Sequence, residues 1–250
     1  MRRELPILFN TEMVRANLDG RKTCTRRVIK AQPDEKHTFP LGFVTGSTEA
    51  KELGCFGFGT NENGGSIQFV KPPYQAGDIL YVRETWQCWR AHRYEATADI
   101  RFRAGGDDVR LQFANGNTDS IDRLEYDTFV HKWFSHNGKW KPALFMPKEA
   151  ARIWLKVTDV RVERLQEITE DGAKAEGAID NRGLIHSPDN EYDRIHTARE
   201  HFIEIWNNTI KKSDLDLYGW DANPWVWVIE FERCEKPQDE GEASKTNPTG

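Results

Sequence analysis

The eight residues from Gly20 to Arg27 form the segment of this chain whose residue types and spacing point most clearly to chemistry. Their sequence is Gly-Arg-Lys-Thr-Cys-Thr-Arg-Arg, which places Lys22 among three arginines. Neighbouring positive charge and burial both disfavour an ammonium ion. A lysine in this setting can act near neutral pH as a nucleophile or a base. The alternative interpretation is a solvated basic turn on the surface.

Two neighbours of Lys22 carry groups that could take part in its chemistry. The hydroxyl of Thr25, three residues on, can hold the amine if the chain bends at Gly20, because a regular strand would point residues 22 and 25 to opposite faces. Cys24 is a candidate nucleophile, because nearby arginines are expected to lower the pKa of its thiol. A small, half-buried side chain beside the functional residues is the favoured interpretation of Cys24.

A lysine that reacts as an amine also needs a partner that carries protons. Spacing alone does not choose among Glu84, Glu170 and Glu176 for this role.

The chain also contains nine tryptophans. Most are expected in the core, and one or two, Trp86 among them, could stack on a base.

Local signals predict the elements that must position these side chains. Thr11 is expected to begin a short helix that Gly20 ends, so the motif starts where a helix stops. Thr169 and Gly177 bound a second predicted helix. Further predictions are a longer helix over about 195–210, a hairpin over 99–114, and strands over 79–86, 153–165 (with a bend or bulge near Asp159) and 225–231.

The order of these elements indicates the fold class. Strands outnumber helices, and the strand–helix alternation of a doubly wound sheet is absent. This pattern favours an α+β fold with a mixed, barrel-like sheet.

Composition narrows the function classes. The 250 residues carry a formal net charge of -5, which argues against a general polyanion-binding surface. The four cysteines are widely spaced, and the histidines show no ligand spacing, so we expect no metal and no cofactor. The chain has no apolar leader and no apolar run of membrane-spanning length, so we expect a cytoplasmic protein with no membrane partner.

The motif and its surroundings resemble the ASCH domain family of the PUA-like superfamily, in a longer subgroup common in prophages. The G-R-K-T-x-T-x-R pattern followed by a Gly-Asp strand is its fairly specific part. The resemblance covers about half the chain. The matching segments are residues 7–9, 11–27, 77–84, 157–160, 165–177 and 225–231.

The resemblance implies a PUA-like mixed β-barrel with flanking helices, forming a single domain over residues 1–234. Long insertions interrupt it at about 31–76, 87–145 and 179–200, and they could build a lid or a partner surface. Residues 235–250 are expected to be a disordered tail, because they are polar and charged.

The resemblance also implies an activity, because a small ASCH subgroup comprises N4-acetylcytidine amidohydrolases. By position, Lys22 corresponds to its nucleophile, Thr25 to the assisting threonine and Glu176 to the glutamate that handles protons. Position 24 is tolerant in the family, which weakens the case for Cys24.

We therefore expect a metal-independent amidohydrolase that acts on N4-acylated cytosine nucleosides, with catalytic residues Lys22, Thr25 and Glu176. The partner is then a nucleoside or modified-base small molecule. The alternatives are a non-catalytic module that binds RNA or a modified base, and a ribonuclease. The expected substrate-binding residues are Arg21, Thr23, Arg26, Arg27, Glu84 and Trp86.

Overall fold

The computed structural model describes residues 3–47, 49–113, 122–134, 139–182 and 196–237. The described residues form three β-sheets and five α-helices, so the predicted α+β class is confirmed. The chain divides into two compact units. The single domain over residues 1–234 that the resemblance implies stays a prediction. One unit comprises Met1–Val14, Ile79–Lys156 and Glu232–Gly250, and the other comprises Arg15–Asp78 and Val157–Phe231.

The largest sheet is mixed, as expected. Its strands, in order, are β1 (Glu4–Leu8), β6 (Ile79–Arg83), β10 (Trp154–Arg164), β11 (Trp225–Cys234) and β2 (Cys24–Val28). β1 runs parallel to β6, whereas β10 runs antiparallel to β6 and β11 antiparallel to β2. A closed barrel would require the two edge strands to pair. Among the described strands β1 and β2 remain edges, so the expected barrel closure is not found.

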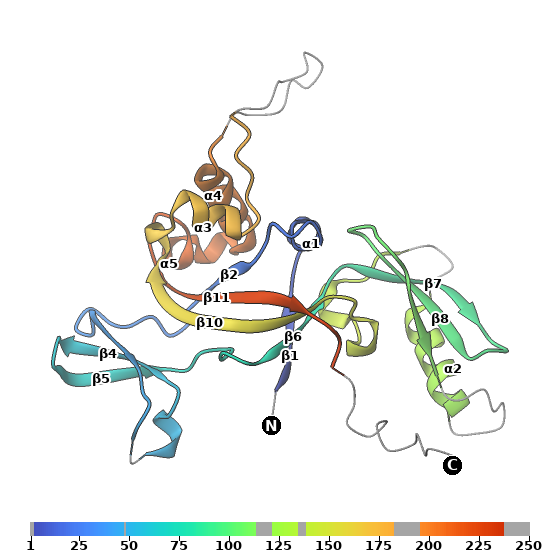
Figure 1. Ribbon diagram of the computed structural model, residues 1–250, viewed down its shortest axis with the longest axis horizontal. Helices are drawn as coiled ribbons and strands as arrows, with labels where there is room; N and C mark the ends of the chain where they lie inside the picture. Colours follow the sequence, from blue (N-terminus) through green and yellow to red (C-terminus); the bar gives the residue numbers. More distant parts are fainter. Residues whose placement is uncertain (1–2, 48, 114–121, 135–138, 183–195, 238–250) are drawn as a thin grey trace, which may run out of the picture. The chain divides into compact units, whose positions relative to one another are not determined.

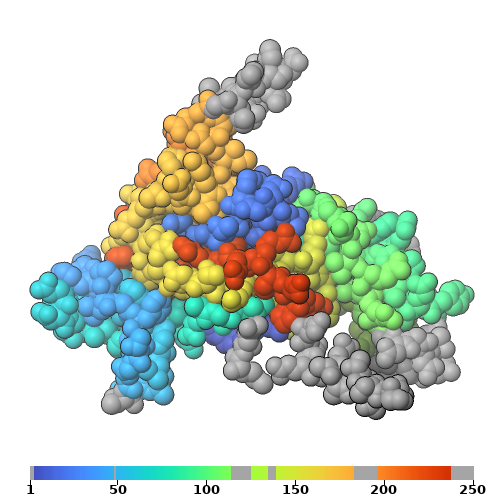
Figure 2. Space-filling view, in the orientation of Figure 1, coloured from blue at the N-terminus to red at the C-terminus, as the bar shows by residue number. Residues whose placement is uncertain are grey.

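In the unit that contains the motif, side chains of β11 alternate between two cores. Val226 and Val228 pack in a cluster with Phe202 and Trp206. This cluster includes residues of α3 (Glu170–Ala175) and α4 (Ala198–Thr209), and α5 (Leu215–Tyr218) lies beside these helices (Figure 1). In Figure 2 the gold and orange atoms of this part of the chain lie directly beside one another.

Trp225 and Trp227 point to the other face of β11, as the two-residue period of a strand requires. There they meet phenylalanines of a second, antiparallel sheet, with Phe58 5.2 Å from Trp225 and Phe43 6.2 Å from Trp227 between ring centroids. This sheet consists of β3 (Phe39–Phe43), β4 (Phe56–Asn61) and β5 (Gly64–Val70). The insertion predicted at 31–76 therefore contributes a sheet.

The other unit holds the third sheet and one helix. The sheet consists of β7 (Trp86–His92), β8 (Thr97–Phe102) and β9 (Val109–Gln112), and the helix is α2 (Asp122–Trp133). Its core includes Trp86, Ile100 and Met146. β8 and β9 form the hairpin that was predicted, with Gly105 and Gly106 at positive φ in the turn.

Most of the predicted local elements are present. α1 spans Thr11–Leu18, and α3 begins after its N-cap residue Thr169. β10 is one continuous strand. It curves along its length (Figure 1), and the sequence predicted a bend or bulge within it, near Asp159. Short 3-10 helices span Ala50–Glu52, Ala143–Phe145, Lys148–Ala150, Leu165–Glu167 and Lys212–Asp214.

Two predictions fall largely outside the described residues. The insertion at 179–200 includes residues 183–195, and the tail includes 238–250. No helix of the described residues is long and apolar enough to span a lipid bilayer.

Candidate active site

The end of α1 fixes the backbone of the motif. Gly20 has φ +75°, and the amides of Arg21 and Lys22 both donate to the carbonyl of Ala16 at 2.9 Å. The Asn17 amide nitrogen donates to the carbonyl of Lys22 at 3.1 Å. The chain therefore wraps around the helix end before β2 begins, which confirms the predicted bend at Gly20.

Lys22 is a buried cation with a full set of acceptors. Its side chain is 0% exposed. Nζ donates at 2.8 Å to the carbonyl of Cys24, to the carbonyl of Glu176 and to Oε2 of Glu176. These three bonds use the three donors of an ammonium group. Burial lowers the pKa of Lys22 below its ordinary value, although the Glu176 carboxylate acts in the opposite direction.

Glu176 reaches Lys22 because α3 ends directly beside α1. Glu176 is the C-cap residue of α3, and Gly177 follows with φ +94°. A Cβ atom on Gly177 would lie 2.7 Å from the Cβ of Ala16. Only glycine accepts both this backbone conformation and this close approach, so Gly177 sets the position of Glu176.

Arg21 and Thr23, two expected substrate-binding residues, hold the end of α3 against the motif. The Arg21 guanidinium donates to the carbonyl of Gly177 at 2.9 Å and forms a salt bridge with Asp19. The backbone amide of Thr23 donates to the carbonyl of Ala175 at 2.9 Å. These contacts give both residues a positioning role.

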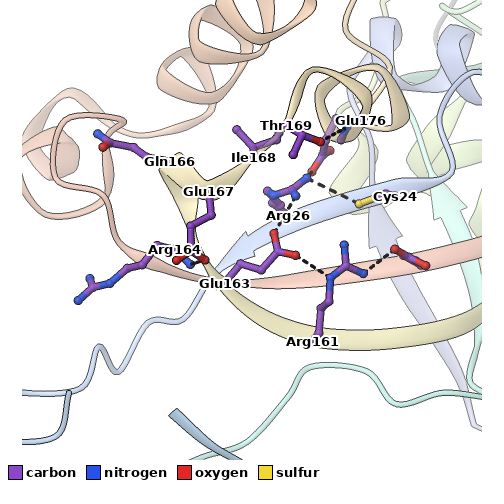
Figure 3. A network of polar contacts seen from close by, with 12 residues as sticks. Cys24, Arg26, Arg161, Glu163, Arg164, Gln166, Glu167, Ile168, Thr169 and Glu176 are labelled. Carbon is purple, nitrogen blue, oxygen red and sulfur yellow. Dashed lines mark hydrogen bonds and ion pairs between the residues drawn. The ribbon is translucent and has the colours of Figure 1, made fainter. Parts of the chain in front are cut away.

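Arg26 extends the site into a chain of alternating charges (Figure 3). Its guanidinium lies 3.5 Å from Oε1 of Glu176 and 2.9 Å from Oε2 of Glu163. Arg161 contacts the other oxygen of Glu163 at 2.6 Å and also binds Glu230. The chain thus runs from half-exposed Glu230 to the buried lysine.

Burial determines the protonation state of the Cys24 thiol. It raises the pKa of the Cys24 thiol to about 12, and the Glu176 carboxylate adds to this rise. Arg26 and Lys22 act in the opposite direction but do not compensate. Arg26 thus lowers the pKa of this thiol as expected, but the expectation of a pKa below the ordinary value is wrong, because burial outweighs the arginine. Cys24 is protonated near neutral pH and is a poor nucleophile.

Thr25 does not hold the lysine amine in this structure. It follows Cys24 in β2, so its side chain points to the opposite face from Cys24 and Arg26. Its buried Oγ1 has no hydrogen-bond partner among the described residues. The oxygens of Cys24 and Glu176 orient the amine instead.

Several buried polar atoms around the Lys22–Glu176 pair lack a hydrogen bond within the described part of the chain. They are Asn17 Oδ1, Thr25 Oγ1, Arg26 Nε and Glu176 Oε1. Folded proteins leave few such atoms, and those that remain are often found at functional sites. The cluster marks the surroundings of Lys22 as a candidate site on grounds that do not depend on the motif.

Arg27 lies on the same face of β2 as Thr25 and lines a cavity of about 560 Å³. Burial lowers the pKa of Arg27, while Glu176 and Tyr74 act to raise it. The charge of Arg27 also contributes to the lowered pKa of Lys22, but less than burial does. The predicted crowding by arginines is thus a secondary cause.

Glu84 and Trp86 belong to the other compact unit and have partners of their own there. Both oxygens of Glu84 accept from Arg152, at 2.9 and 3.0 Å. Burial raises the pKa of Glu84 in spite of this arginine. Trp86 is 0% exposed and packs on Trp133, with ring centroids 5.4 Å apart, so it is a core residue.

The structure therefore chooses among the three candidate proton carriers, because Glu176 is the one that Lys22 binds. Glu170 accepts from the backbone of Arg199 instead. The residues that sequence reasoning missed are Asn17, Arg161, Glu163 and Glu230. The signal of the three charged residues was weak, because charged residues on alternate positions of β10 and β11 are also typical of a solvated strand face.

No group of three or more His, Cys, Asp or Glu side chains in the described residues could hold a metal ion. Comparison of the chain with models of protein families, with curated proteins and with solved structures found no match.

Proposed function

We propose that this chain is an amidohydrolase of N4-acylated cytosine nucleosides, in which Lys22 and Glu176 carry the chemistry. The observation that supports this most directly is the contact of 2.8 Å between Nζ and Oε2 at a fully buried position. The two residues are 154 positions apart, so the fold has to bring them together. The ASCH-like motif supplies the substrate class.

The contact gives the lysine a route to its reactive form. A buried ion pair pays a desolvation penalty on both partners. Transfer of one proton from Nζ to Oε2 converts the pair into a neutral amine and a carboxylic acid. The lowered pKa of Lys22 favours this transfer, because burial disfavours its ammonium form.

The neutral pair can then perform both halves of an amide hydrolysis. The amine can take a proton from a water molecule whose oxygen adds to the acyl carbonyl. Alternatively, the amine itself adds to the carbonyl, the acyl group passes from N4 to Nζ, and a water molecule then hydrolyses the bond between the acyl carbon and Nζ and restores the amine. As the bond between the acyl carbon and N4 breaks, the acid form of Glu176 gives its proton to N4, and the cytosine leaves as a neutral amine. The overall reaction consumes one water and yields cytosine with a free N4 amine, a carboxylate and a proton. Acid–base assistance of this kind contributes about 10²–10⁴-fold in rate.

Arg27 is the candidate for stabilising the oxyanion. Its charge acts on both Lys22 and Glu176, and it comes from the face of β2 that the cavity exposes. A fixed positive charge near the carbonyl oxygen lowers the barrier to the tetrahedral intermediate.

The test is the hydrolysis of N4-acetylcytidine by the wild type, Lys22→Met and Glu176→Gln, with Lys174→Met as the control. Lys174 is an exposed lysine of α3 that pairs with Asp171. We expect kcat to fall at least about 10²-fold in the first two variants, because each removes an acid–base group. The control should keep wild-type activity. Equal turnover by the wild type and Lys22→Met would refute the proposal.

A double variant separates loss of chemistry from loss of folding. Lys22→Met alone leaves the Glu176 carboxylate buried beside Arg26, whereas Lys22→Met with Glu176→Gln leaves a neutral pair. Neutral replacement of a buried ion pair is often tolerated. The double variant should therefore be folded, as judged by circular dichroism and thermal unfolding, and inactive.

The saturation of the Lys22 ammonium by three acceptors favours a second candidate function, a non-catalytic module that binds a modified base. This candidate predicts that N4-acetylcytidine binds without turnover. The same assay, combined with a binding titration, distinguishes the two functions.

A further inference from the structure

The cavity beside Arg27 combines positive charge with aromatic surface. It lies on the face of β2 and β11 that points away from α3 and α4, where Arg27 and Trp227 are paired in the ladder. The insertion at 31–76 supplies one of its walls, after β5. The lining residues that matter here are Arg27, Lys30, Lys71, Phe69, Tyr74 and Trp227.

The positive charges of the cavity are suited to a phosphate. Lys30 and Lys71 are exposed, and neither forms a salt bridge within the described residues. Arg27 adds a third cation, and none of the described residues that line the cavity is acidic. Lysine and arginine donors form strong, charge-assisted hydrogen bonds with phosphate oxygens.

The aromatic side chains are suited to a base. Trp227 is almost fully buried and is held in place by Phe43, which stacks on it at 6.2 Å between ring centroids, and by Phe56 at 6.3 Å. Phe69 and Tyr74 are partly exposed. Partly exposed aromatic rings beside cations are the usual means of binding a nucleic acid base by stacking.

The size of the cavity and the charge of the chain favour one nucleotide over a polymer. A volume of about 560 Å³ is within the range of small-molecule sites. The net charge of -5 works against a long polyanion, which needs a broad basic surface.

We infer that this cavity binds a nucleoside phosphate, with the base on the aromatic side chains and the phosphate at Lys30 and Lys71. The inference rests on the proposed function and deepens it: the substrate is a nucleotide rather than a free nucleoside. β2 connects the cavity to the candidate catalytic pair, because Arg27 lines the cavity and its neighbour Arg26 lies 3.5 Å from Oε1 of Glu176.

The experiment is a calorimetric titration of cytidine 5′-monophosphate and of cytidine into the wild type, Lys30→Glu, Lys71→Glu and the control Lys36→Glu. Lys36 is an exposed lysine that is not among the residues lining the cavity. We expect the monophosphate to bind the wild type at least about tenfold more tightly than cytidine, as charge-assisted hydrogen bonds to a phosphate predict. Lys36→Glu should keep this preference, and Lys30→Glu and Lys71→Glu should each lose most of it.

Equal affinity for cytidine and its monophosphate would overturn the inference, as would a preference that survives both cavity variants. A short RNA that binds more tightly with each added nucleotide would also overturn it, in favour of a polynucleotide. Because binding is measured without turnover, the result stands even if the protein hydrolyses nothing. Conversely, hydrolysis of N4-acetylcytidine without any preference for the phosphate would leave the proposed function standing and remove this inference.

Discussion

Two opposing effects act on the pKa of Lys22: burial lowers it, and the attraction of one carboxylate raises it. Its contacts satisfy the ammonium form, yet burial keeps the pKa of the amine below its ordinary value. Glu176 lies between Lys22 and Arg26, so each cation shares the same carboxylate. This sharing makes the proton position on the Lys22–Glu176 pair sensitive to small changes at either residue.

Removing Lys22 alone should be much more harmful to stability than neutralising the pair. We expect Lys22→Met to lower the free energy of unfolding by about 3–5 kcal/mol, because an unpaired buried carboxylate remains. The double variant with Glu176→Gln should recover at least half of this loss. Urea unfolding of the wild type, both single variants and the double variant measures the coupling. Independent, additive effects would show that the two side chains do not form a buried pair.

The lowered pKa of Lys22 also predicts a dependence of stability on pH. Between the lowered pKa in the folded state and 10.5 in the unfolded state, the unfolded chain holds a proton that the folded chain has released. The contribution of Lys22 to stability therefore increases as pH rises through this window. Urea unfolding between pH 7 and 10 should show the stability of the wild type rising relative to that of Lys22→Met. A difference that shrinks with rising pH would mean that the pKa of Lys22 is raised.

The buried thiols should resist alkylation in the native protein. Burial raises the pKa of both Cys24 and Cys88 to about 12, and Cys55 is also buried. At pH 8 a thiol reagent should modify Cys234 first, since it is only partly buried. Mass spectrometry should find all four cysteines modified only after denaturation. Rapid native labelling of Cys24 would contradict the buried, protonated thiol.

At the scale of elements, the site depends on the meeting of two short helices. α1 ends at Leu18 and presents Ala16 to Gly177, while α3 ends at Ala175 and presents Glu176 to Lys22. A helix as short as α3 has little stability of its own. Its N-cap Thr169, whose hydroxyl accepts from the amide of Gly172 at 3.0 Å, therefore matters for the position of Glu176.

Gly177→Ala should disturb both stability and the candidate site. The new methyl group would lie 2.7 Å from the Cβ of Ala16 at a φ of +94°. We expect a loss of about 3 kcal/mol from overpacking and the unfavourable backbone conformation, together with reduced activity. Gly46→Ala is the matched control, since a Cβ there meets nothing within 4 Å. Thermal unfolding and the N4-acetylcytidine assay check both effects, and equal behaviour of the two variants would argue against tight packing at Gly177.

At the scale of the whole molecule, the chain has a net negative charge, although several cations are gathered at one local site. The formal net charge is -5, whereas Arg27, Lys30 and Lys71 are gathered around one cavity. Because an acidic protein repels a long polyanion, only a ligand small enough to sit within the cavity gains from these cations.

Non-specific affinity for RNA should accordingly be weak. We expect the dissociation constant for a random single-stranded RNA at physiological salt to be larger than about 10⁻⁴ M, the weak end of the range for non-specific binding. Fluorescence anisotropy at several salt concentrations measures it. Tight binding that weakens steeply with salt would instead support the RNA-binding alternative.

Local signals in the sequence by themselves determined where most helices and strands lie and where the chain bends at the start of the motif. Gly20 and Thr169 mark a helix end and a helix start, and the alternation of apolar residues marks strands such as β6 and β11. These signals act over a few residues, through backbone conformation and side-chain periodicity, so they can be recognised without knowing what the chain packs against. They gave the bend at Gly20 and the α+β class correctly.

Only the tertiary structure decided which side chains meet and which are buried. It joined Lys22 to Glu176, placed Thr25 on the other face of β2, and put Glu84 and Trp86 in a different unit. It also raised the pKa of the Cys24 thiol, where its charged neighbours suggested a decrease. The physical reason is the same in each case: desolvation and pairing depend on segments that approach from far along the chain, and no pattern within the motif itself carries that information.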